Sequence, residues 1–327
     1  MKRILVVGEL NVDLIMSGLP SLPVLGKELL CQDFQLVLGG SSSICACWMA
    51  GVGAGLDARV DLWGKVGSDP YGDFLIQALQ AQGVGTQGVI RDPAIRTGAT
   101  ISLTYPHDRA MMTFLGAIAE LQLSDIDLDK LPSYDHLHSA SIFLQHRLRP
   151  DLGALFEAAQ NAGLTTSLDS GWDPDDEWQG VLDILSHVDF FLPNETEANH
   201  LSGERTVEQA ARALSRTAKT VVVKLGAEGA LAQSGEQTWR VPGFPVAPVD
   251  TTGAGDSFNA GFVCAHVVQG RSIPDAMRFA NACGAIAVTT IGGTTGIPPA
   301  GEVDAFITRQ KMQGSRNVSG RSADLEI

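Results

Sequence analysis

Positive charge is scarce in this sequence. It carries 23 lysines and arginines against 37 aspartates and glutamates, which gives a formal net charge of −14 at pH 7. Nucleic acids and anionic membranes repel such a surface, so we expect neither as a partner. An anionic ligand must then be held by local dipoles, metal ions and a small number of cations.

Long apolar runs are also lacking. No segment approaches the length of a membrane span, and the opening run to Gly8 is too short for a signal peptide. We therefore expect a cytoplasmic protein. Hydrophobic residues still make up 44% of the 327 residues, and there are 36 glycines, which indicates a turn-rich globular chain with an ample core.

Cysteine is too rare to form a disulfide framework. The five cysteines are an odd number and stand in mostly apolar surroundings, at Cys31, Cys45, Cys47, Cys264 and Cys283. We interpret them as buried free thiols. Cys45 and Cys47 also lack the second pair of cysteines or histidines that a four-ligand metal site requires.

Linkers rich in proline, glycine or serine are absent, so we predict one domain over residues 1–308. From Asp135 to about residue 225, strand patterns alternate with helix patterns at 151–162, near 177–186 and within 195–217. This alternation predicts an α/β protein with a parallel sheet and helices on both faces. Residues 12–38 and 97–117 instead favour short strands, which we interpret as a small β lid over a cleft. Residues 309–327 are polar and unpatterned and predict a disordered tail.

A glycine turn leads into a helix late in the chain, in the stretch Asp-Thr-Thr-Gly-Ala-Gly-Asp-Ser-Phe at 250–258. Gly253 and Gly255 let the backbone bend where a side chain would clash, and an apolar helix follows. The unpaired N–H groups of the first helical turn and the helix dipole form a site for an anion such as a phosphate. Asp256 lies in this turn, where we expect it to be ionised and to accept a proton from a nearby hydroxyl. The short pattern Gly-x-Gly-Asp taken alone is better explained by an ordinary helix capped by an aspartate after a glycine turn.

The longer stretch is more specific than its parts. It resembles the second signature of the ribokinase-like (PfkB) carbohydrate kinase family, and the resemblance extends over roughly residues 3–305. It implies a three-layer α/β/α fold with a central, mostly parallel sheet and a small β lid. It also implies ATP-dependent phosphorylation of a hydroxyl group on a small sugar, with Asp256 as the base and the amides of Gly253, Ala254 and Gly255 as the anion hole.

The same resemblance implies further ligands. Sugar contacts fall on Asp13, Gly39, Gly40 and Asp169, and nucleotide contacts fall on Asn194, Lys224, Gly226, Gly229 and Asn281. Glu197 would act on Mg²⁺ through water, and Asp250 and Thr252 match positions whose backbone groups hold a monovalent cation such as K⁺. The implied partners are a small sugar and ATP, and two lids pairing edge to edge would make a homodimer.

Two departures from the family pattern leave the acceptor open. Ile44 replaces the asparagine of the first signature, and the Asp-x-Asn-x-Arg segment is degraded at 169–173. Trp172 could provide a stacking wall, whereas Arg96 or Arg109 on the lid could meet an acidic or phosphorylated sugar. A nucleoside kinase with Trp172 and Phe114 at its base slot, or a nucleotide-binding regulator without turnover, remains an alternative.

Overall fold

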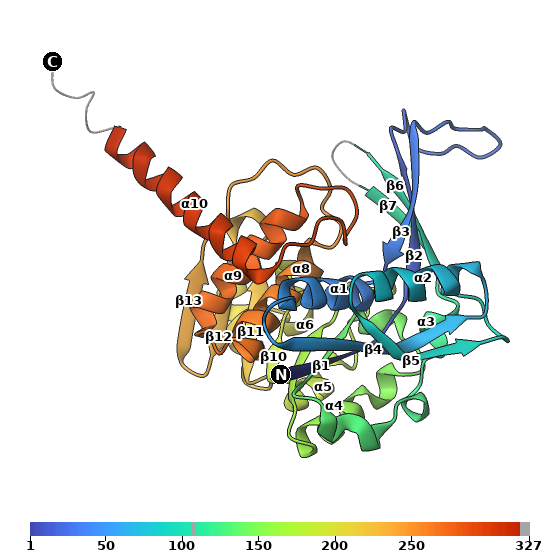
Figure 1. The fold of residues 1–327 in the computed structure, drawn as a ribbon, viewed down its shortest axis with the longest axis horizontal. Coiled ribbons are helices and arrows are strands. Elements are labelled where there is room, and N and C mark those ends of the chain that lie inside the picture. Colours follow the sequence, from blue (N-terminus) through green and yellow to red (C-terminus); the bar gives the residue numbers. More distant parts are fainter. Residues whose placement is uncertain (106–108, 321–327) are drawn as a thin grey trace.

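A nine-stranded sheet forms the centre of the molecule (Figure 1). The computed structural model describes residues 1–105 and 109–320. Neighbouring strands run parallel from β5 to β11, and β12 and β13 continue the sheet as an antiparallel hairpin. In spatial order the strands are β13 (Gln237–Val241), β12 (Ala230–Ser234), β11 (Thr220–Lys224), β10 (Phe190–Phe191), β9 (Thr165–Asp169), β8 (His136–Ala140), β1 (Lys2–Val7), β4 (Ala58–Gly67) and β5 (Gly85–Asp92).

Helices cover both faces of this sheet, because alternate residues of its strands point to opposite sides. In β1, Ile4 and Val6 join one apolar cluster, and Leu5 and Val7 join another. The first cluster packs against α1 (Ser41–Gly53), α2 (Pro70–Ala81), α8 (Ala254–Val263), α9 (Ile273–Ala287) and the start of α10 (Ala300–Gly320). The second packs against α4 (Leu152–Asn161), α5 (Val181–Ile184), α6 (Glu195–Ser202) and α7 (Val207–Leu214). The predicted three-layer α/β/α arrangement is thus confirmed.

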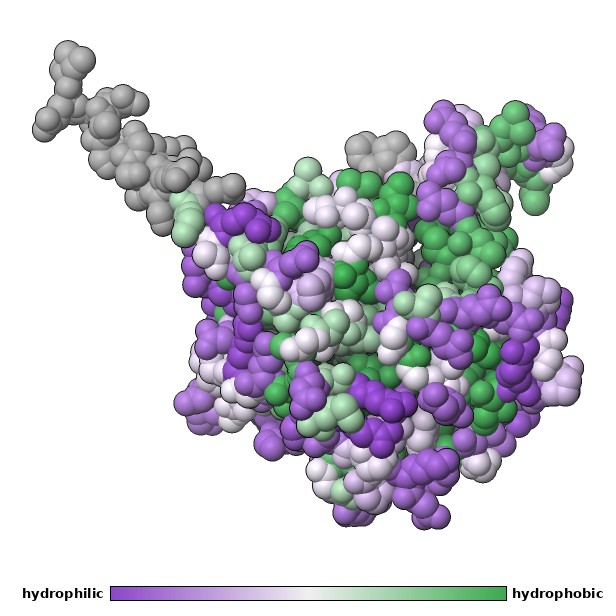
Figure 2. Space-filling model, in the orientation of Figure 1, coloured by the Kyte–Doolittle hydropathy of each residue, from purple (hydrophilic) through white to green (hydrophobic). Residues whose placement is uncertain are grey.

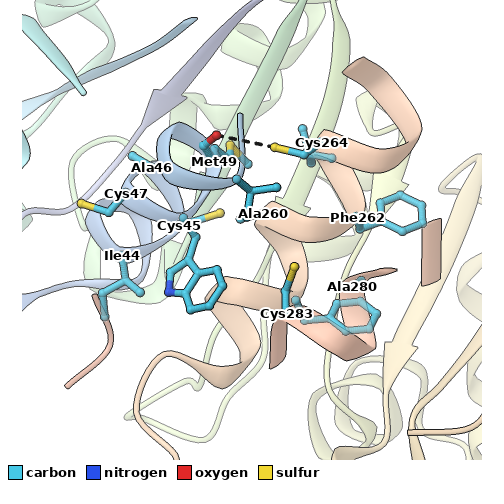
Figure 3. Close-up of a cluster of buried hydrophobic side chains, with 14 of the residues drawn as sticks. Ile44, Cys45, Ala46, Cys47, Met49, Ala260, Phe262, Cys264, Ala280 and Cys283 are labelled. Carbon is cyan, nitrogen blue, oxygen red and sulfur yellow. Dashed lines mark hydrogen bonds between the residues drawn. The ribbon is translucent and has the colours of Figure 1, made fainter. Parts of the chain in front are cut away.

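The cysteines mostly fill the first cluster. Cys45 and Cys47 on α1, Cys264 and Cys283 are buried free thiols, and the Cys264 thiol donates to the backbone oxygen of Met49 at 3.6 Å (Figure 3). The prediction of burial is wrong for Cys31, which is exposed on the loop between β2 and β3.

A second, four-stranded sheet stands above the first (Figure 1). We call it the lid sheet; its order is β3 (Asp33–Gly39), β2 (Asn11–Ser17), β6 (Gly98–Thr104) and β7 (Arg109–Phe114). Its strands come from the two segments whose residues favoured short strands. Part of the predicted turn between the last two strands, residues 106–108, lies outside the described residues. Since β2 follows β1 closely, the lid sheet rises from the carboxyl end of the central strands.

Two helix predictions require correction. Residues 309–320, expected to be disordered, continue α10, because Val303 and Ile307 are buried one turn apart and anchor the helix against the core. Residues 321–327 lie outside the described residues. The helix expected near 177–186 is only the single turn α5, since the preceding loop is held by Asp173, which accepts bonds from the backbone N–H groups of residues 175, 177 and 178.

The remaining helices are short. A four-residue helix, α3, spans Ala117–Glu120, and a π-helical segment, Cys264–Val268, extends α8. Within residues 1–105 and 109–320, none of the helices is both long enough and apolar enough to traverse a bilayer.

Candidate active site

A cavity of about 860 Å³ lies between the carboxyl ends of the central strands, the lid sheet and the N-terminal ends of α1, α6 and α8. Parallel α/β sheets bind their ligands at this edge. Eleven of the residues proposed from the sequence line it, namely Asp13, Gly40, Asp169, Asn194, Glu197, Lys224, Gly226, Thr252, Gly253, Gly255 and Asp256. Residues distant in the sequence therefore meet in one pocket that also contains the glycine turn.

The glycine turn has the backbone conformation that its sequence suggests. Gly253 has φ +75°, in the left-handed region that favours glycine, and α8 begins at the next residue, Ala254. A Cβ on Gly253 would lie 2.8 Å from the Cα of Gly293, so a side chain would also collide with the neighbouring backbone. Gly253 and Gly255 both face the cavity. The first turn of α8 can therefore present N–H groups to an anion there. Ala254 N itself donates to the backbone oxygen of Thr251 at 3.3 Å.

Asp256 faces the same cavity from the first turn of α8 but is only 8% exposed. Burial raises the pKa of this carboxyl well above its ordinary value, and the negative charge of Asp169 raises it further. Lys224 and the Ser41 hydroxyl act in the opposite direction. The expectation of an ordinary ionised carboxylate rested on the helix dipole alone and neglected this burial.

Lys224 and Asp169 form a buried ion pair beside the turn. The Lys224 ammonium donates to Asp169 Oδ2 at 2.6 Å, and the Asn259 amide donates to the same oxygen at 2.5 Å. Burial favours neutral forms, yet Lys224 holds the pKa of Asp169 below its usual range, and Asp169 raises the pKa of Lys224. A Cβ on Gly255 would lie 3.4 Å from the Lys224 ammonium, so this cation borders the anion turn.

Asn194 and Glu197 are engaged with each other at the start of α6. Glu197 N donates to Asn194 Oδ1 at 2.9 Å and Asn194 N donates to Glu197 Oε2 at 2.8 Å, which forms a capping box. The Asn194 side-chain amide also donates to Glu197 Oε1 at 2.6 Å. Burial and the nearby charge of Asp169 raise the pKa of Glu197 to about 7. Both side chains also face the cavity, so the cap positions an acid and an amide at its wall.

The lid sheet contributes a carboxyl and a cation. Asn11 donates to Asp13 Oδ1 at 3.0 Å and to Thr100 Oγ1 at 2.9 Å, which fixes the start of β2. Burial raises the pKa of Asp13 to about 6. Arg109 Nη1 on β7 donates to Thr252 Oγ1 at 2.7 Å. The lid sheet thereby contacts the residue that precedes the glycine turn.

Five of the proposed residues do not line the cavity. Asn281 donates to the backbone oxygens of residues 241 and 242, and Gly229, with φ +101°, packs against the same segment. Asp250 accepts from Thr252 N and from Gly292 N, each at 2.9 Å, and so joins two loops. Gly39 leaves room for the Asp13 carboxyl, and Ala254 opens α8.

From the sequence we assigned no specific role to the cavity residues Glu9, Ser41 and Ser141, or to Asn259, which contacts Asp169. Glu9 is 2% exposed and follows β1, where a polar residue at the carboxyl end of a central strand could have drawn attention. Ser141 has φ 50° after β8, which a sequence pattern does not reveal. Asn259 lies three residues after Asp256 and so shares its helical face, a spacing visible in the sequence.

The matching protein family agrees with this site. The family model described as pfkB family carbohydrate kinase matches residues 1–300. The chain belongs to this family. The family membership predicted from the sequence is confirmed, and the protein is accordingly an ATP-dependent carbohydrate kinase.

Curated relatives match the kinase over most of its length. A 2-dehydro-3-deoxygluconokinase of Bacillus subtilis is 31% identical over 295 residues, which cover 86% of this chain and 89% of the relative. A ribokinase of the same organism is 27% identical over 330 residues, which cover 94% and 100% of the two chains. The relatives thus act on different sugars, and their likeness does not single out one acceptor.

Solved structures have the same fold. The kinase is similar to a Thermotoga maritima ribokinase (30% identity, TM-score 0.80, 94% and 100% of the chains covered). It is also similar to an E. coli protein in complex with ATP and Mg²⁺ (25% identity, TM-score 0.84, 94% and 100% of the chains covered). A third similar structure is a Vibrio cholerae fructokinase double mutant with fructose, ADP and potassium bound (28% identity, TM-score 0.78, 94% and 98% of the chains covered). The predicted ribokinase-like fold is therefore confirmed.

Proposed function

We propose that this kinase transfers the γ-phosphoryl group of ATP to a hydroxyl group of a small sugar, with Asp256 as the base. The observation that carries the proposal is the position of Asp256 in the first turn of α8, facing the cavity beside the left-handed Gly253. The amides of residues 253–255 form the anion hole. Residues 1–308 then act as one kinase domain, with the lid sheet covering the acceptor.

Phosphoryl transfer depends more on placement and charge neutralisation than on covalent assistance. The N–H groups at the start of α8 receive the transferring group, and the Lys224 ammonium beside Gly255 offsets its charge. The raised pKa of Asp256 makes this carboxylate a stronger base than an exposed aspartate. Asp13 and Asn11 hold the acceptor from the lid side, and Gly40 leaves space for its approach.

The residues at the cavity wall fit Mg²⁺ held through water. Within the described residues, no group of three or more histidines, cysteines or acids could hold a metal ion. Mg²⁺ usually keeps several waters and binds through one or two carboxylates together with substrate phosphates, so it needs no such group. Glu197, with Asn194, would hold it in this way. When bound, the ion neutralises charge on the phosphates.

A monovalent cation fits near Asp250. This carboxylate fixes the backbone of Thr252 and Gly292, whose loops flank the anion turn. The potassium in the similar fructokinase structure supports K⁺ at the backbone groups of Asp250 and Thr252. Turnover measured in K⁺ and in an equal concentration of tetramethylammonium tests this. Equal rates would contradict it.

The acceptor is a sugar rather than a nucleoside. Trp172 faces the cavity and is 54% exposed, but Phe114, the other residue suggested for a base slot, points its ring to Arg96 instead. Of the two aromatic residues suggested for binding a nucleoside base, Trp172 therefore lines the cavity and Phe114 does not. Arg109 and Lys224 would suit an acidic sugar, since both cations face the cavity. A regulator without turnover would have no use for the buried Asp256 beside the anion turn.

Two copies would associate through their lid sheets. Apolar side chains are exposed on these strands and their loop, and Figure 2 shows such a green area at the upper right, where the lid sheet stands. Phe34 on β3 is 54% exposed and Met112 on β7 is 55% exposed. Light scattering after size-exclusion chromatography tests the homodimer, and Phe34→Glu should yield monomers.

The location expected for such an enzyme is the cytoplasm, where ATP is available.

The decisive experiment measures ADP release with ATP, Mg²⁺ and a panel of sugars, sugar acids, phosphosugars and nucleosides. We expect turnover on a sugar or sugar acid. Asp256→Asn should reduce that turnover by about 10²-fold or more while ATP affinity stays nearly unchanged. Activity confined to nucleosides would favour a nucleoside kinase. Near-normal turnover in Asp256→Asn would show that this residue is not the base.

A further inference from the structure

A second cavity lies at the edge of the central sheet, where β1, β4 and β5 run side by side (Figure 1). Its volume is about 370 Å³, which is within the range of small-molecule sites. It lies on the face of the sheet that carries the second apolar cluster, since Trp63 and Tyr134 belong to that cluster and line the cavity. Within residues 1–105 and 109–320, no residue lines both cavities, so the second cavity is separate from the active site.

A buried carboxylate forms part of the wall of this second cavity. Asp61 on β4 is 4% exposed, and its Oδ2 accepts from Arg3 Nη2 at 2.8 Å and from the Tyr134 hydroxyl at 3.0 Å. Arg59 Nε lies 3.4 Å from Asp61 Oδ1 without a hydrogen bond. Among the described residues, Asp61 Oδ1 and Arg3 Nε are buried atoms that have no hydrogen-bond partner. Buried polar atoms are nearly always paired, so one acceptor and one donor remain for a bound water or ligand.

The pairing of β4 with β5 is irregular at this cavity. Asp61 pairs with Gly85, and Trp63 pairs with Gly88, so β5 carries one extra residue between the two pairs. A side chain on Gly85 would collide with the Asp61 carboxylate, and one on Gly88 would collide with the Trp63 ring. The bulge also brings the exposed Gln87 to the cavity. Bulges of this kind are frequent at sheet edges and beside functional sites.

Basic side chains at the cavity favour an anion. Two acids of the wall are each paired with a lysine: Lys65 Nζ lies 2.6 Å from Asp125 Oδ2, and Lys130 Nζ lies 2.8 Å from Asp127 Oδ2. Arg59 is exposed, and its guanidinium makes no hydrogen bond within the part of the chain that the structure describes. Since a guanidinium binds phosphate through parallel hydrogen bonds, this side chain can receive a phosphate group.

The aromatic rings favour a sugar over a nucleotide. Trp63 and Tyr134 meet edge to face at 5.7 Å, and the Arg3 guanidinium lies over the Tyr134 ring at 4.5 Å. Both rings are buried, so neither has a face free for the stacking that nucleotide bases commonly use. Hydroxyl groups both donate and accept, so neighbouring hydroxyls of a sugar suit the unpartnered Asp61 Oδ1 and Arg3 Nε.

We propose that this cavity is a second ligand site, which binds a small sugar phosphate. The sugar hydroxyls donate to Asp61 Oδ1 and accept from Arg3 Nε and the Gln87 amide. The phosphate accepts from Arg59 and Lys130 at the exposed side of the cavity. Arg59 turns from Asp61 Oδ1 to the phosphate and so makes this oxygen accessible to a hydroxyl. Sugar phosphates are also the products of carbohydrate kinases, so the enzyme itself generates this class of ligand.

Each cavity contains one tryptophan, which allows binding to be located without turnover. Trp63 lines the second cavity, and Trp172 lines the active-site cavity. In the full-length protein labelled with 5-fluorotryptophan, the five tryptophans give separate fluorine NMR signals, and Trp63→Phe and Trp172→Phe identify two of them. Because this measurement follows binding alone, its outcome does not depend on the role of Asp256.

The first test is a titration of the labelled protein with ribose 5-phosphate and with fructose 6-phosphate. Ribose, inorganic phosphate and AMP serve as comparisons. At least one sugar phosphate should shift the Trp63 signal, with an affinity about tenfold or more above that of ribose, phosphate or AMP. Shifts confined to Trp172 would place the ligand in the active site. That result, or equally tight binding of inorganic phosphate or AMP at Trp63, would overturn the proposal.

The second test removes the proposed phosphate ligand. Arg59→Gln should weaken the Trp63 response to the sugar phosphate about tenfold or more. Arg91→Gln is the matched control, because Arg91 is also exposed, lies on the neighbouring strand β5 and pairs with Asp73 outside the cavity. Neither arginine lines the active-site cavity, so both variants should keep wild-type turnover. Wild-type affinity in Arg59→Gln, or an equal loss in Arg91→Gln, would contradict a specific site.

Discussion

The conformation of Gly253 allows a quantitative test of the anion turn. A Cβ at this position would lie 2.8 Å from Gly293 Cα and 3.1 Å from Ile44 Cγ2, and φ is +75°. Gly253→Ala therefore adds left-handed strain of about 1–2 kcal/mol and overpacking of about 1–3 kcal/mol. We expect the free energy of unfolding to fall by roughly 2–5 kcal/mol. Turnover should fall as well, because the amides that we propose as the anion hole would have to move.

Gly203→Ala is a control with nearly the same backbone conformation. Gly203 has φ +72° at the end of α6, and no atom lies within 4 Å of the Cβ that would be added. This variant carries the conformational strain alone, about 1–2 kcal/mol, and leaves the cavity intact. Urea unfolding gives the loss of unfolding free energy in each variant, and the difference between the two losses measures the cost of the collision at Gly253. ADP release measures the effect of each variant on turnover. Equal unfolding free energies with wild-type turnover in Gly253→Ala would refute the geometry of the turn.

Three further predictions concern pH, the acceptor and the last helix. Burial raises the pKa of Glu197 from 4.5 to about 7, so its stabilising contribution is complete below pH 4.5 and is lost as pH rises through 7. The contribution of this group to the free energy of unfolding of the ligand-free protein should be roughly 2–3 kcal/mol smaller at pH 8 than at pH 5. Glu197→Gln, which retains a capping residue, should remove this part of the pH dependence, and an unchanged dependence in calorimetry would count against it. Trp172→Ala should raise the KM of the acceptor severalfold and leave the KM of ATP unchanged, whereas parallel changes would place Trp172 outside the acceptor site. Deletion of residues 313–327 should leave the melting temperature within about 1 °C, because the buried anchors Val303 and Ile307 precede the deletion; a larger fall would show that the end of α10 contributes to stability.

The local parts of the site could be predicted from the sequence. The bend at Gly253, the helix start at the next residue and the position of Asp256 all depend on neighbouring residues, and the structure has each of them. The alternation of strands and helices likewise indicated the layers, because the apolar residues of β1 point in turn to both faces.

Contacts between distant segments could not be predicted in the same way. The pairing of Asp169 with Lys224 spans 55 residues, and the contact of Ser141 with Ser41 spans 100. No periodicity in the sequence encodes such distances. The raised pKa of Asp256 could not be predicted for the same reason, since it depends on burial and on the distant residue Asp169. Asn281 donates to the backbone oxygen of residue 241 at the end of β13, and its contact with the nucleotide stays a prediction.

The side chain of Ile44 limits how this kinase could change its acceptor. It is 3% exposed and reaches both Gly253 and Gly293, so it wedges the first turn of α1 against the phosphate loop. Ile44→Asn would remove that apolar contact with the two glycines and place an amide at the cavity wall. Exchange of Trp172, which is 54% exposed at the cavity, would instead leave the packing of Ile44 against Gly253 and Gly293 intact, so we expect acceptor preference to change more readily there.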